Sequence, residues 1–275
     1  MYKGVLLLRG REHDDRIRKE RSMIYDLQKA SMWKRISAFL FDVILLGIVA
    51  VMFAWSLSAA LGYDRQSQAL DAAYDRYAEE YGVNFSMSLA EYEAMTEEEA
   101  ANLQAAYDAL SADEEAVYAY GMMIQLTLLI TSLCLLLAHL TMEFAIPLAL
   151  GNGQTLGKKI FGLGVMRTDG VKVGGVVMFI RAILGKYTIE TMIPVLIAVM
   201  IFFNMIGIVG PLVLALILIL QIVLLAVTQT NSAIHDLLAK TVVVDYMSQR
   251  IFENEEELIE FKKKLHAERS ARSEY

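Results

Sequence analysis

Features that define several protein classes are absent from this 275-residue chain. Cys134 is the single cysteine, so no disulfide can form within the chain. Residues 4–8 are too few for the apolar core of a signal peptide, and we expect the first long apolar segment to act as the targeting signal. No Ser/His/Asp, Cys/His or HExxH arrangement is present, so we predict neither an enzyme nor a bound cofactor.

Charged residues are also missing over a long stretch. Residues 191–235 contain no Asp, Glu, Lys or Arg, which is too long for one membrane crossing of about 20 residues. Asn204, Gly207, Gly210 and Pro211 interrupt this stretch and predict a tight hairpin between two membrane helices. The whole chain is 56% hydrophobic with a mean hydropathy of +0.43, as expected for a protein that lies partly in lipid.

The apolar segments predict an all-α polytopic membrane protein with four transmembrane helices in the lipid bilayer. We expect these helices at residues 33–61, 120–148, 179–203 and 211–238. Trp33 and Trp55 lie near the two ends of the first segment, where aromatic side chains prefer the membrane interface.

The segment between the first two predicted helices is strongly acidic. Residues 63–118 hold 14 Asp and Glu against 2 Arg, a balance of −12, so the total of −7 leaves +5 elsewhere. This distribution indicates neither an acidic soluble protein nor a nucleic-acid-binding protein. Three capping boxes predict a small helical insert: Ser88 with Glu91, Thr96 with Glu99, and Ser111 with Glu114. Its acidic surface either attracts cations or is a solvated helical face.

Both terminal segments are rich in charge. Residues 1–32 are basic and polar, and they either form an amphipathic helix on the membrane surface or a solvated cytoplasmic tail. The apolar positions of that helix are Ile17, Met23, Ile24, Leu27 and Met32. Residues 246–275 predict a charged cytoplasmic helix with one apolar stripe.

A glycine-rich basic loop, residues 151–175, connects the second and third predicted helices. Its Asp169-Gly170 pair predicts a β-hairpin, and residues 241–244 are expected to add a strand that completes a short cytoplasmic sheet. The loop is not a phosphate-binding P-loop, because its glycine spacing is wrong and Lys159 stands where Ser or Thr would bind Mg²⁺.

The distribution of basic residues predicts the orientation. Lys and Arg number ten up to Arg35, six in residues 151–186 and seven from Lys240 onward, but two in the acidic insert. With four crossings, the positive-inside rule places every basic segment and both termini in the cytoplasm. The acidic insert then lies outside, and the protein lies in the cytoplasmic (inner) membrane.

Three stretches within residues 33–245 carry a resemblance to a known family. They are Trp33-Lys-Arg35 through Phe41-Asp42, residues 153–159 with Gly162, Val165, Asp169-Gly170 and Arg181, and residues 233–241 with Asp236. This combination resembles the RDD family of bacterial membrane proteins, named for one arginine and two aspartates. The resemblance assigns the arginine to Arg35 and the aspartates to Asp42 and Asp236, and it alone implies cation/proton antiport. The acidic insert and the C-terminal tail lie outside the matching motifs.

Ionisable residues in and beside the predicted helices form the candidate site. Asp42 lies two helical turns beyond Arg35, inside the apolar segment, where a carboxylate at the bilayer centre costs ~2.5–3.5 kcal/mol. The topology brings Arg35, Asp42, Arg181 and Asp236 toward the cytoplasmic half of the bundle as an intramembrane ionic site. Either Arg35 and Asp236 tie the first helix to the fourth, with Asp42 bonded to a hydroxyl or basic group, or Asp42 carries protons or cations.

Four further residues are weaker candidates: His139, Glu143, Lys158 and His235. His139 and Glu143 share a helical face and are compatible with a metal pair, although an interhelical hydrogen bond or a place near the headgroups is favoured. His235 and Asp236 are adjacent, so in a helix they point in different directions and are not a dyad by themselves.

Two functions are compatible with this arrangement. The preferred one is transport of a small cation or solute, with Na⁺, K⁺ and H⁺ as candidate ions. The alternative is a non-transporting interaction or assembly partner, either a homo-oligomer or bound to another membrane protein. It would act through the acidic insert or the C-terminal helix.

Overall fold

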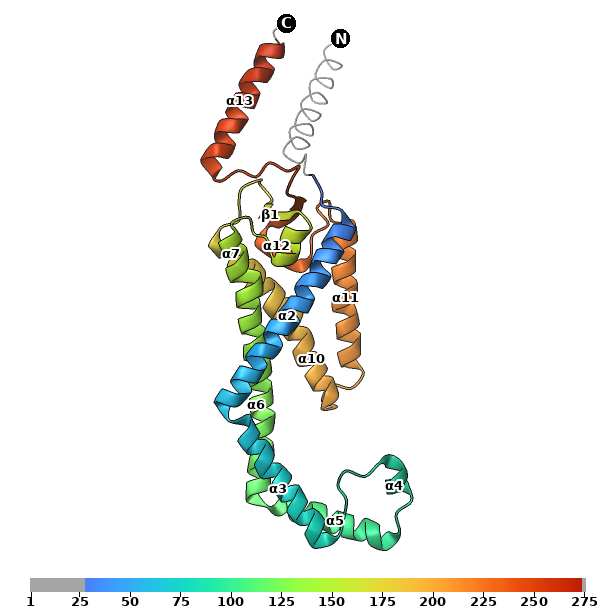
Figure 1. Ribbon diagram of the computed structural model, residues 1–275. Coiled ribbons are helices and arrows are strands. Elements are labelled where there is room, and N and C mark those ends of the chain that lie inside the picture. The colour runs from blue at the N-terminus through green and yellow to red at the C-terminus, as the bar shows by residue number, and fades with distance from the viewer. Residues whose placement is uncertain (1–27, 274–275) are drawn as a thin grey trace, which may run out of the picture. The chain divides into compact units, whose positions relative to one another are not determined.

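The computed structural model describes residues 28–273 and is mostly helical (Figure 1). These residues fall into two compact units, one of which comprises Ile48–Leu137. The other comprises the described residues up to Gly47 and from Ala138 onward. Helices α2 (Met32–Leu61) and α6 (Glu114–His139) each contribute residues to both units. The helix predicted within residues 1–32 lies almost entirely outside the described residues.

Four helices between residues 28 and 273 are long and apolar enough to cross a membrane, which confirms the predicted fold class. They are α2, a composite helix over Glu114–Leu150, a second composite over Gly175–Phe202, and α11 (Val209–Val227). Exposed apolar side chains follow α11 at helical spacing, as lipid-facing residues do: Leu212, Leu216, Ile219, Val223 and Val227.

Both composite spans contain π-helical segments. These are η1 (Leu140–Ala145), between α6 and α7 (Ile146–Leu150), and η2 (Ile180–Met192), between α9 (Gly175–Phe179) and α10 (Ile193–Phe202). Pro147 and Pro194 lie in the first turn of the α-helix that follows each segment. Since proline has no N–H to donate to the preceding turn, the α-helical bonding pattern is interrupted at these places.

α10 and α11 lie side by side and form the predicted hairpin (Figure 1). Asn204 and Gly207 take positive φ angles of 53° and 48° in the turn between them. Gly210 permits the close approach of the two helices, because a Cβ at this position would lie 2.5 Å from the Ile201 side chain.

The fourth predicted helix, residues 211–238, is wrong at its C-terminal end. α11 stops before Thr228, and a separate short helix, α12 (Ile234–Ala239), follows a turn. The Thr228 hydroxyl donates to a carbonyl one turn earlier (2.6 Å) and accepts a backbone N–H four residues later (2.7 Å), and Asn231 adopts φ 50°. The Asp236 carboxylate then accepts a backbone N–H at the start of α12 (3.3 Å).

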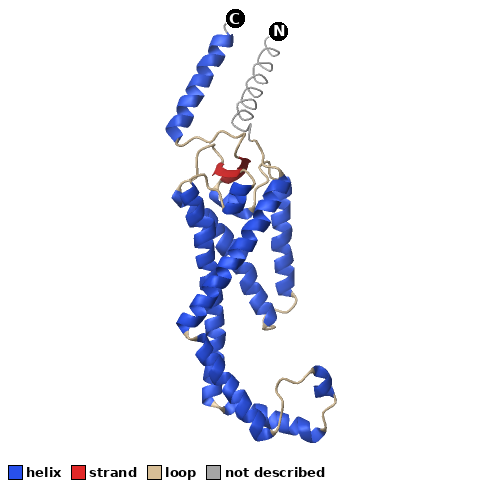
Figure 2. Ribbon diagram, viewed as in Figure 1, coloured by secondary structure: helices blue, strands red, loops and turns tan. Residues whose placement is uncertain are grey.

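A two-stranded antiparallel sheet joins β1 (Leu163–Arg167) to β2 (Thr241–Asp245), shown as red arrows in Figure 2. Val165 lies opposite Val243, and both side chains are buried. The core that carries the sheet comes from α2, the strands, α9 and the segments just before the two helices: Ala30, Ala38, Leu163, Val165, Val173, Met178 and Val243.

The predicted hairpin is present only in part. Gly170 adopts φ 95° and its N–H bonds the carbonyl three residues earlier (3.0 Å), as the turn requires. The returning arm makes an isolated bridge, Met166 with Lys172, instead of a strand. α9 begins at Gly175, which leaves this arm short. Residues 241–245 form the regular strand beside β1, and Met166 pairs with both Lys172 and Val242.

Within Ile48–Leu137, the predicted insert consists of α3 (Tyr63–Tyr81), α4 (Leu89–Glu93) and α5 (Glu97–Ala112). Capping boxes start α4 at Ser88 and α5 at Thr96, as predicted. The third predicted box is wrong: the Ser111 hydroxyl donates to the Asp108 carbonyl (2.9 Å). Asp113 instead accepts the N–H groups of residues 115 and 116 (2.9 and 3.1 Å) and starts α6.

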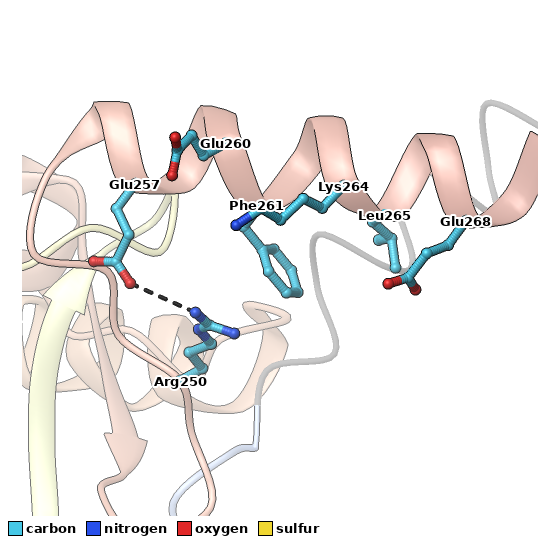
Figure 3. A pocket seen from close by; sticks show the side chains of 7 residues that line it. All are labelled: Arg250, Glu257, Glu260, Phe261, Lys264, Leu265 and Glu268. Atoms are coloured by element: carbon cyan, nitrogen blue, oxygen red, sulfur yellow. Dashed lines mark ion pairs between the residues drawn. The ribbon is translucent and has the colours of Figure 1, made fainter.

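The predicted C-terminal helix is α13 (Glu255–Ser273). Arg250 lies before it and pairs with Glu257 (3.5 Å), and its guanidinium stacks over the Phe261 ring at 4.5 Å (Figure 3). These side chains line an open groove of about 460 Å³ together with Glu260, Lys264, Leu265 and Glu268.

Candidate ionic site

Asp236 is the centre of the candidate site. It is fully buried, with Oδ1 2.9 Å from Arg181 Nη2 and Oδ2 3.7 Å from Arg35 Nη2. The Arg181 contact depends on charge, because its Nη2 hydrogens are not aligned with the carboxylate oxygen. The Thr241 hydroxyl also donates to Oδ1 (3.2 Å). Asp236 therefore links α12 to α2, η2 and β2.

The electrostatic balance at Asp236 favours its ionised form. Burial opposes ionisation, but the facing Arg181 and Arg35 guanidinium groups outweigh it and hold the pKa of Asp236 well below its usual range. The same balance makes the carboxylate costly to remove, because both guanidinium groups are themselves largely buried.

Asp42 forms no ion pair with Arg35 or Arg181, but binds the segment that follows the second span. Its Oδ2 accepts from the Thr155 hydroxyl (2.5 Å) and its Oδ1 from the Gly157 N–H (2.8 Å). Lys158 Nζ lies 3.9 Å from the carboxylate. A Cβ at Gly157 would lie 2.4 Å from the Ala38 carbonyl oxygen, so glycine is required for this contact between α8 (Leu156–Ile160) and α2.

Lys158 is buried with its ammonium group among both signs of charge. Burial, followed by the nearby Lys186, lowers the pKa of Lys158 to about 8, although Glu143 and Asp42 act in the opposite direction. Its Nζ donates to the Thr155 hydroxyl (3.2 Å). Lys158 is therefore a buried amine that can lose its proton in a mildly alkaline range.

The His139 and Glu143 pair is divided between different partners. Glu143 Oε1 accepts from Lys186 Nζ (2.5 Å), whereas His139 Nε2 lies 3.3 Å from the Thr191 hydroxyl. The His139 ring also meets Tyr187 edge to face, with 5.6 Å between centroids. Among residues 28–273 no group of three His, Cys, Asp or Glu side chains is placed to hold a metal ion. This arrangement matches an interhelical hydrogen bond better than a metal pair.

Glu190 and His235 form a further, partly buried pair between η2 and α12. His235 Nδ1 lies 2.9 and 2.8 Å from the two Glu190 oxygens, and the backbone N–H of His235 donates to Oε1 (3.0 Å). Gln221 of α11 donates to the same oxygen (3.2 Å). Lys186 and Glu190 were not among the predicted site residues, although an ionisable residue in an apolar span is itself a signal.

Together these side chains form what we term the ionic network. Its four acidic members balance its four basic members when His235 is neutral: Asp42, Glu143, Glu190 and Asp236, with Arg35, Lys158, Arg181 and Lys186. Glu143 lies in η1, whereas Arg181, Lys186 and Glu190 lie in η2. π-helical turns are frequent at functional sites. The groove on α13 shares no lining residue with the network.

Comparison with known families matches residues 29–240 to the RDD family. The chain belongs to the RDD family. The matched residues include the whole ionic network, so the network is part of the family domain and not of the tail. Neither the curated proteins nor the solved structures compared with the chain gave a match. The chain is thus a multi-pass membrane protein of the RDD family.

Proposed function

We propose that this RDD family protein transports a small cation, Na⁺ or K⁺, across the membrane in exchange for H⁺. One observation carries the proposal: the ionic network places buried carboxylates within helices that are candidate membrane spans. Ionisable groups inside membrane helices are costly, and they mark ion pathways and proton relays in membrane proteins.

The pairing in the network favours a cation as cargo. Glu143 is held by the Lys186 ammonium and Asp42 lies near the Lys158 ammonium, so the fixed charges are compensated without cargo. A small cation that reaches such a carboxylate competes with the internal ammonium group. Binding therefore releases a side chain of another element, which couples cargo to movement of that element.

The test is ion flux in proteoliposomes that contain Na⁺, K⁺ and a pH-sensitive dye. We expect the wild type to exchange a cation for protons, and Asp42→Asn and Glu143→Gln to lower the rate at least tenfold while remaining folded. Glu253→Gln is the control, because it removes an exposed carboxylate that pairs with Lys172 at the surface. If the wild type moves none of these ions, the transport function is excluded.

A second candidate function follows from α13. Its groove combines the apolar Phe261 and Leu265 with three acidic and two basic side chains, which suits an amphipathic helix of a membrane partner. An assembly partner of this kind would lose its phenotype on deletion of residues 247–275, or of 65–115 in the acidic insert. Asp42→Asn would then leave the phenotype intact, which is the opposite of the transport result.

For both functions we propose a location in the cytoplasmic membrane of a bacterium with both termini inside, because basic residues concentrate in the same loops and ends. Neither function assigns catalysis to the chain.

A further inference from the structure

His235 lies between two carboxylates of the ionic network. Its Nδ1 faces Glu190 at 2.8 Å, and its Nε2 lies 3.7 Å from Asp236 Oδ1. Gly185 of η2 fixes the depth of this contact, since a Cβ there would lie 2.5 Å from the His235 Cβ. The imidazole is therefore held with one nitrogen toward each acid.

The contacts decide which nitrogen of the neutral ring carries hydrogen. Two oxygens of Glu190 lie within hydrogen-bond distance of Nδ1, so Nδ1 holds the proton and donates it. Nε2 then carries a lone pair that faces Asp236 Oδ1. Both atoms are hydrogen-bond acceptors, so their contact is repulsive. A proton on Nε2 turns this repulsive contact into an attractive one.

We propose that His235 is the proton-binding site of this protein, taking a proton from hydronium on Nε2 so that the imidazolium bridges Glu190 and Asp236. One O–H bond of hydronium breaks as the Nε2–H bond forms, a water molecule leaves, and the network gains one positive charge. Because Asp236 is shared, an imidazolium beside it weakens its hold on Arg35 of α2 and Arg181 of η2. Its use in cation exchange rests on the proposed function, whereas proton binding does not.

The charged groups around His235 set when it takes the proton. Arg181 and Glu190 face it from η2, Asp236 is its neighbour, and Arg35 reaches that aspartate from α2. Burial is the largest influence and lowers the pKa of His235, with Arg181 acting in the same direction against the two acids. The ring is thus neutral at pH 7 and above in the fold, and it takes its proton in the acid range.

The sign of the stability effect follows from this lowered pKa. The unfolded chain binds the proton more readily, near pH ~6.5, so folding is favoured above that pH and loses stability as pH falls below it. Carboxylates in the unfolded chain protonate near pH ~4, so a change in stability between about pH 6.5 and 5 comes from protonation of histidine. Loss of thermal stability in that interval should be present in the wild type and smaller in His235→Asn, which keeps a donor toward Glu190, whereas the buried His139 is common to both proteins.

Proton binding is measured directly on the wild type by NMR of ¹⁵N-labelled histidine in lipid nanodiscs. We expect the His235 resonance to report protonation of Nε2 with a midpoint below about 6.5, and Glu190→Gln to shift that midpoint lower by at least about half a unit. His266→Asn is the control, because this exposed histidine lies on α13. A ring that stays neutral to pH 4.5, or a midpoint that Glu190→Gln leaves in place, overturns the proposal.

Flux measurements separate this proposal from the proposed function. If both hold, His235→Asn makes cation flux independent of pH between 5 and 7 or abolishes it, whereas His266→Asn retains the wild-type profile. A wild type without cation flux, but with a His235 midpoint that depends on Glu190, excludes transport and leaves the proton site standing. Flux with an unchanged pH profile in His235→Asn overturns the role of His235 and leaves transport standing.

Discussion

Replacing Asp236 with asparagine is expected to destabilise the protein strongly, because this carboxylate compensates two guanidinium groups at once. Asp236 is fully buried, and the Arg181 and Arg35 side chains retain 3% and 12% of their exposure. Removal of one member of a buried ion pair costs about 3–5 kcal/mol, since the remaining charge loses its partner. Asparagine has nearly the same size and still accepts from Thr241, so the loss reports charge and not packing.

Thermal unfolding in lipid nanodiscs measures this loss. For chains of comparable length, each kcal/mol shifts Tm by about 2–4 °C, so we expect Asp236→Asn to lower Tm on the order of 10 °C. Arg181→Met should cost more than Arg35→Met, because the Arg181 contact is 2.9 Å and the Arg35 contact is 3.7 Å.

The matched control is Asp169→Asn. Asp169 pairs with Arg167 at the surface, where both side chains are more than a third exposed, and such pairs contribute about 0–1 kcal/mol. Its Tm should stay within about 4 °C of the wild type. An Asp236→Asn protein that melts as the wild type does would refute the view that Asp236 compensates buried charge.

Two further predictions concern packing and topology. Gly157→Ala should reduce the folded yield severalfold, because the added Cβ would lie 2.4 Å from a backbone oxygen of α2. Gly47→Ala is the control and should keep the wild-type yield, because the space at that position is open. Equal yields of the two variants would contradict the contact between Gly157 and α2. The second prediction tests the cytoplasmic location of both termini. In a Cys134→Ala background, a membrane-impermeant maleimide should label Leu89→Cys in intact cells but not Met247→Cys, although both positions are exposed. Labelling of both variants, or of Met247→Cys alone, would contradict this orientation.

The number of membrane helices was predictable because lipid imposes a strict condition on the sequence. Every backbone polar group in the bilayer must bond within its own segment, so spans are helical. Charged side chains are costly in lipid, so spans lie in long uncharged runs such as residues 191–235. The turn within that run was also predictable, because Asn204 and Gly207 tolerate the positive φ angles that it needs. These signals are local and do not depend on the rest of the fold.

The end of α11 was missed although its signals are local. The prediction extended the helix to residue 238, although residues 228–232 are all polar. The hydroxyl of Thr228 and the left-handed Asn231 compete with helical bonding, which hydropathy does not register. The helix cap at Asp236 was missed for a different reason. Asp236 was interpreted only as an ion-pair residue, and its carboxylate also accepts the backbone N–H at the start of α12.

The partners within the candidate site were only partly predictable. The link between Arg35 and Asp236 followed from topology, because both residues were expected at the inner ends of their helices. The Asp42 partners Thr155 and Gly157 lie at the start of α8, more than a hundred residues away, and nothing in the sequence of α2 indicates them. The π-helical register of η2 likewise depends on contacts that a single sequence does not display.

The equality of acids and bases in the ionic network has a consequence for membrane voltage. A potential of 100 mV acts on each elementary charge that crosses it with about 2.3 kcal/mol. Rigid displacement of an array with no net charge does no net electrical work. Such a network is indifferent to the resting potential, and under the proposed function a bound proton or cation adds the charge on which the potential acts.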